Sequence, residues 1–379
     1  MNNVKKIWLL AIPAVVVLTI ITVVLIQQNN RPKQVVEAFE QAVDQKKPEQ
    51  LKDILLVDNK KAEIDESSLK AFVTYLNANY NSYQVIKDSL EEQLEKQEYN
   101  MTNQQISLVE DGKRFGVFTD YKLKVKTGYI KVTGLSEEDQ VTLSVDKTKD
   151  SLMKSEEELY GPLLPGTYDV RLTVKNTLGT FLEKRKVEVW GGSKQVSLLV
   201  DDSDLAQKDK GVQQNVLAAL DVFNNDLIVF QTNNYETKHF TNVTDEVREV
   251  TAFAKYDFEF YKEYVDEIQM QYLGAVVNLD DLDINHFNDE WVAEVTALVS
   301  YKNKMKVRDM KGFEDISYKT VRTYKMKYDE KSKKWLIADL EGIKADGSES
   351  DDWENKTELK NEDSPVMKWT RKKDKSNMF

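Results

Sequence analysis

Six basic residues have the types and spacing best suited to binding chemistry. Four of them alternate with other residues, and two more follow nearby with the same spacing. They are Lys302, Lys304, Lys306, Arg308, Lys325 and Lys327. Successive side chains of a β-strand point to opposite faces, so residues spaced by two share a face. Such a face could bind a polyanion. The alternative is an ordinary solvated sheet face that acidic helices balance.

The charge distribution around these residues is uneven. Residues 212–300 hold 17 acidic and 4 basic side chains, whereas residues 301–344 hold 7 acidic and 13 basic ones. The whole chain carries a net charge of −12 at pH 7, which argues against a protein whose whole surface binds nucleic acid. No nucleic-acid partner is therefore expected.

Candidates for catalysis and metal binding are few. The only histidines, His239 and His286, lie in expected loops between polar neighbours, and the chain has no cysteine. The acidic run at residues 280–285 fits the start of a calcium loop but then fails, with His286 where glycine should be and Val292 where a bidentate glutamate should be. We expect a solvated acidic loop there, and no catalytic residue, metal site or cofactor.

The elements that must position the basic residues lie in a domain predicted at residues 212–344. An amphipathic helix over 212–230 and a second over 244–268 precede long alternating strands, with a charged linker at 201–211 before them. Trp291 to Tyr301 alternate in one run, and a closing hairpin ends near Leu340. The low-complexity residues 345–379 are expected to be a disordered tail.

The start of the chain predicts a membrane anchor. Residues 7–26 carry no charge and include fourteen Ile, Leu or Val, enough for a helix of about 30 Å, the thickness of a bilayer core. We expect a transmembrane helix at residues 7–27 and, because of Lys5 and Lys6, a cytoplasmic tail at 1–6. The bulk of the chain would then be extracytoplasmic.

Two further domains are expected between the anchor and the terminal domain. Residues 33–127 show helical periodicity and then strand alternation, including a hairpin turn at 110–113, which indicates a membrane-proximal α+β domain. Residues 128–201 show only short alternating runs separated by turns, which predicts a small β-sandwich. The Pro165-Gly166 step within it sets a tight turn at a strand entry.

This combination resembles the TcaA family, the teicoplanin-resistance-associated membrane proteins of Gram-positive bacteria, and their YvbJ-like relatives. The resemblance is carried by the apolar span, the helical-then-β module, the PLLPGTY strand entry and the hairpin from Asp329 to Leu340. That last pattern looks like a nuclear-transport-factor-2-like (NTF2-like) cone. Many family members carry a four-cysteine zinc ribbon before the span; this chain has none there, so the ribbon's role does not carry over.

The expected fold class is therefore multidomain α+β: one transmembrane helix, an α+β membrane-proximal domain, a small all-β sandwich and a C-terminal α+β cone. The resemblance implies a role in Gram-positive envelope homeostasis and in the response to cell-wall antibiotics. We expect a single-pass, non-catalytic envelope protein that acts by binding. Its polyanion would be teichoic acid or the carboxylates of peptidoglycan. Two alternatives stay open: an enzyme using the terminal cone, or a scaffold for a membrane sensor or wall synthase.

Overall fold

The computed structural model describes residues 31–114, 118–136, 138–146, 151–155, 157–191, 195–361 and 363–372. The expected transmembrane segment, residues 7–27, lies outside these ranges. Among the described residues, no helix combines the length and the apolar character needed to cross a membrane. The described chain divides into two compact units. Unit 1 runs to Val174 and includes Leu182–Val200, and unit 2 comprises Lys175–Phe181 and the chain from Asp201 onward.

Unit 1 begins with three helices over a small sheet. They are α2 (Arg31–Asp44), α3 (Glu66–Ala78) and α4 (Tyr80–Lys96), with the short 3-10 helix η1 (Pro48–Leu51) between α2 and α3. The Asp65 side chain caps α3 by accepting from the Ser68 amide at 2.7 Å. Phe39, Phe72 and Leu76 are fully buried and belong to one apolar cluster with the strands, so the helices are held by their apolar stripes.

The sheet under these helices corrects the predicted hairpin. Its order is β1 (Leu55–Val57), β3 (Phe118–Val125), β2 (Ile106–Arg114), with β1 parallel to β3. Residues 110–113 do not form the turn; they continue β2 through a register irregularity between Glu110 and Lys113. A Glu-Asp-Gly-Lys run suits a turn and also suits a bulge, which likewise favours a glycine at positive φ, and Gly112 has a φ of 75°.

The β module of unit 1, where the sequence predicted a small sandwich, has two three-stranded sheets. One has the order β6 (Leu159–Leu163), β4 (Gly128–Thr133), β9 (Gln195–Leu199), and the other β5 (Gln140–Val145), β7 (Gly166–Lys175), β8 (Thr180–Val189). Gly166 packs against α3: a Cβ there would lie 2.6 Å from the Ala71 carbonyl carbon. The Trp190 ring stacks on Tyr75 with centroids 4.2 Å apart, so this module and the helices share a core.

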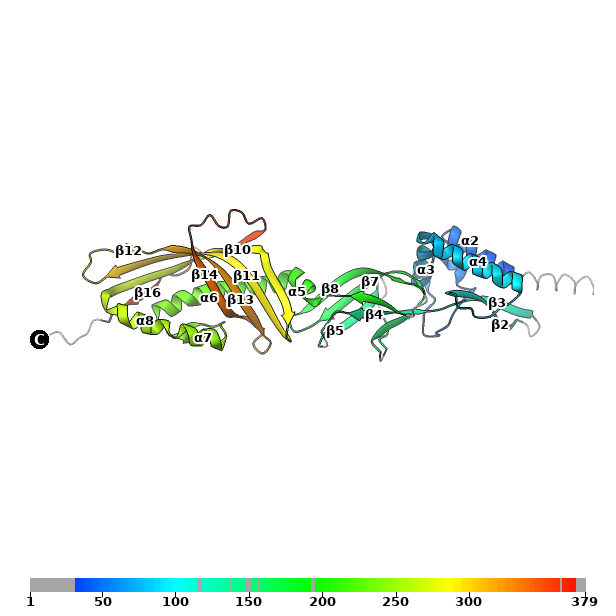
Figure 1. The fold of residues 1–379 in the computed structure, drawn as a ribbon, viewed down its shortest axis with the longest axis horizontal. Coiled ribbons are helices and arrows are strands. Elements are labelled where there is room, and N and C mark those ends of the chain that lie inside the picture. Colours follow the sequence, from blue (N-terminus) through cyan, green and yellow to red (C-terminus); the bar gives the residue numbers. More distant parts are fainter. Residues whose placement is uncertain are drawn as a thin grey trace, which may run out of the picture. The chain divides into compact units, whose positions relative to one another are not determined.

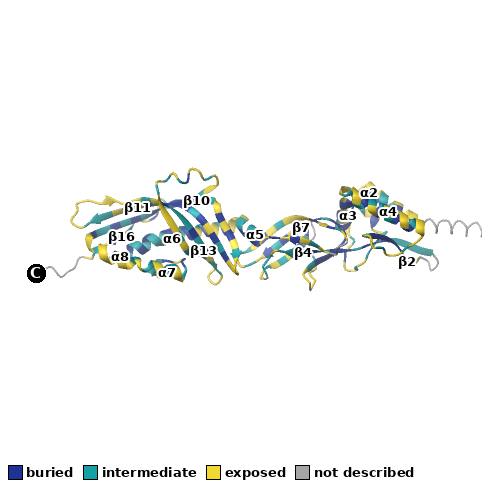
Figure 2. Ribbon diagram, in the orientation of Figure 1, coloured by how far each residue is buried: buried dark blue, intermediate teal, exposed yellow. Residues whose placement is uncertain are grey.

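Unit 2 is a seven-stranded antiparallel sheet with helices on one face (Figure 1). Its main order is β14 (Lys334–Ala345), β13 (Tyr318–Asp329), β11 (Glu290–Val307), β10 (Val265–Phe287), β15 (Lys356–Lys360); β12 (Glu314–Asp315) pairs with β11 and β16 (Met367–Thr370) with β10. Buried and exposed residues alternate along β11 (Figure 2). Trp291, Val295 and Val299 are buried in the core of this unit, which defines the inner face of the sheet.

The segment predicted to be a charged linker is helical. Helix α5 (Asp202–Lys208) is capped by Asp201, whose side chain accepts from the amides of Ser203 and Asp204. Helix α6 (Lys210–Thr232) is capped by Asp209 in the same way. The linker prediction was wrong because aspartates at helix N-termini resemble a polar linker in composition, while each one satisfies amides that the helix leaves free.

The second predicted helix of this unit is shorter than expected. It divides into α7 (Asp245–Thr251), α8 (Ala254–Tyr261) and the 3-10 turn η3 (Lys262–Tyr264), after the 3-10 turn η2 (Thr237–His239), and β10 begins at Val265. Val265 and Ile268 fit a helical stripe, but a register shift between Val265 and Glu267 also lets both face the core of a strand. The acidic run 280–285 likewise lies in β10 and is not a loop.

The disordered tail predicted at residues 345–379 is corrected over its described residues, 345–361 and 363–372; residue 362 and residues 373–379 lie outside the described ranges. Strand β15 pairs with β10 through Thr357 and Leu359, and β16 pairs with β10 through Met367 and Trp369. Trp369 is only 8% exposed and packs against Phe258 at a centroid distance of 5.1 Å. The polar composition of the tail indicated disorder. The average composition does not show that a single tryptophan in β16 packs into the core and holds the strand in place.

Candidate functional site

The predicted basic residues lie on the outer face of the unit 2 sheet, opposite the helices. Lys302, Lys304 and Lys306 alternate on β11 with inward-facing residues, and Arg308 follows its end. Lys302, Lys304 and Lys306 lie opposite three residues of β10, which are Gln271, Gln269 and Glu267 respectively. Lys302, Lys304 and Arg308 are exposed, and Lys306 is half-buried. None of the four forms an ion pair with any residue in the described ranges.

Lys325 and Lys327 are placed elsewhere on the same face. Lys325 lies opposite Glu294 of β11, eight residues from Lys302, or about 27 Å at about 3.4 Å per residue. Its ammonium pairs with Asp339 at 3.2 Å and Glu341 at 3.1 Å, and Lys327 pairs with Glu290 at 2.8 Å. The structure therefore splits the six residues into an unpaired group of four and a distant pair that acidic neighbours balance.

The tail strand β16 adds a fifth cation to the unpaired group. Lys368 lies opposite Gln269, which lies opposite Lys304 on its other side. Residues directly opposite one another in an antiparallel pair share a face, so Lys368 and Lys304 occupy one row across three strands. Lys368 is exposed. We call Lys302, Lys304, Lys306, Arg308 and Lys368 the basic face.

Two carboxylates border the basic face. Asp315 on β12 lies opposite Lys304, and Glu267 lies opposite Lys306. Hydrogen bonds from Ser317 lower the pKa of Asp315, and Lys304 and Lys302 contribute a smaller lowering. The Glu267 carboxylate accepts from the Gln269 side chain at 2.7 Å. Two anions among five cations leave the face positive.

The inner face carries a buried polar network centred on Asn224 of α6. Its Oδ1 accepts hydrogen bonds from Tyr301 at 2.6 Å, Tyr324 at 3.0 Å and Arg322 at 2.9 Å. The Arg322 guanidinium also donates to the Tyr301 hydroxyl at 2.7 Å and lies over its ring, 5.2 Å from the centroid. Burial raises the pKa of both tyrosines, so their hydroxyls stay protonated and can donate.

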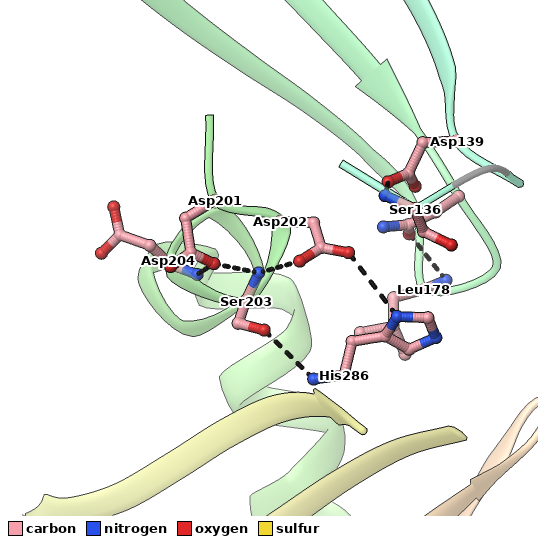
Figure 3. A network of polar contacts seen from close by, with 9 residues as sticks. Ser136, Asp139, Leu178, Asp201, Asp202, Ser203, Asp204 and His286 are labelled. Atoms are coloured by element: carbon pink, nitrogen blue, oxygen red, sulfur yellow. Dashed lines mark hydrogen bonds and ion pairs between the residues drawn. The ribbon is translucent and has the colours of Figure 1, made fainter. Parts of the chain in front are cut away.

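Two further pairs in unit 2, Asp221 with Tyr272 and Asp202 with His286, combine a carboxylate with a side chain that can exchange a proton. Burial raises the pKa of Asp221 on α6, while the nearby Tyr272 hydroxyl lowers it by less. That hydroxyl is buried without a partner at hydrogen-bond geometry among the described residues. At the α5 end, His286 Nδ1 lies 3.8 Å from an Asp202 oxygen, and the His286 amide donates to Ser203 Oγ at 3.1 Å (Figure 3). His286 is thus in β10 and half-buried, not in the expected loop.

Two pockets open on the inner face and meet at Tyr318. The larger, of about 590 Å³, is mostly apolar; its lining includes Tyr235, Tyr261, Ile268, Met270 and Met305. The smaller, of about 430 Å³, is lined by Tyr318, Thr320, Arg322, Leu340, Gly342, Ile343 and Lys344. Neither the Asp221–Tyr272 pair nor the Asp202–His286 pair lines these pockets.

Comparisons with known proteins agree with this arrangement. A family model described as the TcaA protein second domain matches residues 32–125, and one described as the YvbJ NTF2-like domain matches residues 216–341. This chain is TcaA/YvbJ-like, with a C-terminal NTF2-like domain. The curated protein named "Uncharacterized membrane protein YvbJ", from Bacillus subtilis (strain 168), is 25% identical over 170 residues, which cover 44% of this chain and 27% of that relative's length.

The matched regions do not contain all of the site in this TcaA/YvbJ-like chain. The NTF2-like match ends at residue 341, so Lys344 and Lys368 lie beyond it. Lys344, Arg322 and Asn224 were not predicted as site residues from the sequence. Lys368 belongs to the basic end of the chain, for which a solubilising tail was preferred over contact with a polyanion. The alternation of apolar and polar residues around Lys368 and Trp369 could have predicted a strand there. The signal for Arg322 was weaker, because it is an arginine at an inward position of β13.

No group of three or more acidic or histidine side chains among the described residues is arranged to hold a metal ion. The acidic run 280–285 of this TcaA/YvbJ-like chain spans a register shift in β10 between Asn278 and Asp283. Asp280 accepts from the Asn355 amide at 3.1 Å, and Asp283 from the Asn285 side chain at 2.6 Å. Asp280 thus contacts the residue that precedes β15, and Asp283 contacts a residue of its own strand.

Proposed function

We propose that this chain is a non-catalytic, membrane-associated protein of the bacterial envelope that binds an anionic wall polymer on the basic face. The observation that carries the proposal is that its cations are largely exposed and form no ion pair within the described part of the chain. Clustered unpaired cations attract a polyanion and release its counterions. Lys325 and Lys327 already pair with carboxylates, so they would contribute much less to polymer binding.

The candidate polymers are teichoic acid and peptidoglycan. Both present anionic groups at intervals along a chain, phosphates in the first and carboxylates in the second, and a row of cations on strands of one sheet matches a linear ligand. Similarity to a relative named as a membrane protein supports the membrane association. The apolar residues 7–26 support an anchor with the described units outside the cell. A role in the response to wall antibiotics follows the TcaA resemblance.

Co-sedimentation of the detergent-solubilised full chain with Gram-positive cell walls tests the proposal. The walls would be used with teichoic acid present and stripped, at two salt concentrations. The double variant Lys304→Glu/Lys306→Glu should weaken binding by about tenfold or more at low salt, because each reversed contact costs about 1 kcal/mol or more. Binding should also fall as salt rises.

The matched control is Lys325→Glu/Lys327→Glu, which makes the same charge change on the same face. It should leave polymer binding near the wild-type level, since those lysines are occupied by Asp339, Glu341 and Glu290. Equal losses in both double variants would mean that only net charge matters. Binding to stripped walls alone would favour peptidoglycan, and no binding at all would favour a membrane protein partner, to be sought by crosslinking.

A second candidate is an enzyme, because unit 2 contains the kind of pair that general acid–base chemistry uses. Burial raises the pKa of Asp221 beside the buried Tyr272, and raised carboxyl pKa values are common at catalytic sites. Incubation of wall fragments with the full chain, followed by mass spectrometry, tests this. A product that forms with the wild type and not with Asp221→Asn would replace the binding proposal.

A further inference from the structure

The inner face of unit 2 contains a cation that no acid of the described chain neutralises. Arg322 points inward from β13 and donates to Asn224 and Tyr301, both neutral. The carboxylates of the adjacent strand, Asp339 and Glu341, pair with Lys325 on the outer face. A guanidinium with five donors, fixed by two neutral partners and stacked on a tyrosine ring, is preorganised for an oxyanion.

A second cation lies beside it at the mouth of the smaller pocket. Lys344 on β14 is opposite Thr320, and Gly342 is opposite Arg322, so all four residues share the inner face. Lys344 is exposed and forms no ion pair among the described residues. Gly342 keeps the approach open: a Cβ there would lie 3.3 Å from Arg322 Cγ. Both cations therefore line one open pocket.

The apolar pocket begins where this cationic pocket ends. Tyr318 lines both, and its ring stacks on Tyr301 at 5.0 Å with an interplanar angle of 27°. Beyond it, the larger pocket presents mainly apolar and aromatic surface, including Ile268 and Met270. A concave apolar pocket with a few convergent polar groups is the usual form of a small-molecule site.

We propose that the inner face of unit 2 binds an amphiphilic oxyanion. Its carboxylate or phosphate contacts Arg322 and Lys344, and its apolar body lies beyond Tyr318 in the larger pocket. This site lies on the opposite face of the sheet from the basic face and is independent of polymer binding there. Tyr318 separates the two parts of the ligand, so a ligand lacking either part uses only half of the site.

Binding of three matched probes tests the site. The probes are 4-phenylbutyrate, 4-phenylbutyl phosphate and the uncharged 4-phenylbutanol, titrated by calorimetry into the full chain in phosphatidylcholine nanodiscs, with empty nanodiscs as the blank. At least one anionic probe should bind about tenfold or more tightly than the alcohol, since a partly buried ion pair contributes about 1.4 kcal/mol or more. The better anion identifies carboxylate or phosphate as the preferred head group.

Variants assign the binding to these residues. Lys344→Glu should weaken the preferred anion about tenfold and leave the alcohol unchanged, whereas Lys331→Glu, the same charge change in the distant turn after β13, should change neither. Arg322→Gln should remove the preference for the anion; should it unfold the chain, Lys344→Glu alone decides. Binding of the alcohol as tightly as both anions, binding of none of the probes, or an unchanged anion affinity in Lys344→Glu would overturn the proposal.

Discussion

At the scale of single residues, Asn224 accepts the hydrogen bonds of the polar groups buried in the core of unit 2. It is fully buried, and its one carbonyl oxygen serves two tyrosine hydroxyls and Arg322. Its amide nitrogen donates to the Leu220 carbonyl at 2.8 Å, which fixes the orientation of the side chain. Such a network is stabilising only while every member is satisfied.

Replacing Asn224 by alanine should therefore destabilise unit 2 by about 3 kcal/mol or more, because each buried group left unsatisfied costs about 1–3 kcal/mol. Chemical denaturation of the full chain measures the change. Asn224→Asp is the matched control: it keeps an acceptor oxygen and adds a negative charge beside Arg322, so it should lose much less. An alanine variant as stable as the wild type would show that water satisfies the tyrosines.

A second residue-scale prediction concerns Asp221. Burial raises its pKa in the folded state above that of the unfolded chain. The folded state then binds more protons than the unfolded state between the two pKa values, so the free energy of unfolding falls as pH rises through that window. Asp221→Asn should remove the fall. Its melting temperature should exceed the wild type's at pH 7 and converge with it at pH 3.

Both proteins would be measured across the whole pH range in the same buffer series. Asp226→Asn is the control, since Asp226 is a nearby acid on α6 that accepts from the Thr241 amide and hydroxyl at 2.7 Å. That variant should be destabilised by the loss of its charge. A parallel pH dependence in wild type and Asp221→Asn would contradict the prediction.

At the scale of elements, β10 organises unit 2. It pairs with β11 along its length on one side and with β15 and β16 on the other. Gly274 allows this: its φ is 121°, and a Cβ would lie 2.1 Å from the Leu359 carbonyl oxygen. The tail strands therefore complete the sheet edge, and β16 brings Lys368 beside Lys304.

Removing the Trp369 side chain should detach β16 from β10. Trp369→Ala deletes a ring that packs on Phe258 and an indole that donates to Asn234 at 2.9 Å, so it should cost about 3 kcal/mol. Hydrogen exchange measured by mass spectrometry should show lost protection at residues 367–370 and in the facing part of β10. Lys372→Ala, at an exposed end position, should change nothing; intact protection in Trp369→Ala would show that β16 is held by its backbone alone.

How far the sequence predicted these elements depends on how local their signals are. The alternation from Trp291 to Arg308 predicted β11 and the shared face of its lysines, because strand periodicity is a local property. Lys368 could not be placed, because β16 pairs with residues about a hundred positions earlier and no local pattern encodes that partner. The pairing of Lys325 with Glu341 and the inward position of Arg322 depend on strand register in the same way.

At the scale of the whole molecule, each unit has a hydrophobic core of its own. Leu76 is fully buried in the core of unit 1, and Ile337 is fully buried in that of unit 2. Residues 33–127 and most of the β module lie together in unit 1. Lys175–Phe181, the tip between β7 and β8, belongs to unit 2, where Phe181 is buried.

Core truncations should therefore act within one unit at a time. Leu76→Ala and Ile337→Ala should each cost about 2–5 kcal/mol, and hydrogen exchange in the full chain should rise only in the unit that carries the change, because local stability follows the core that each segment packs into. The segment Lys175–Phe181 gives the clearest test, because it belongs to unit 2 while the strands on either side of it belong to unit 1. Its amides should respond to Ile337→Ala and not to Leu76→Ala, although β7 and β8 flank it in sequence; the opposite response would place this tip in the folding unit of its own strands.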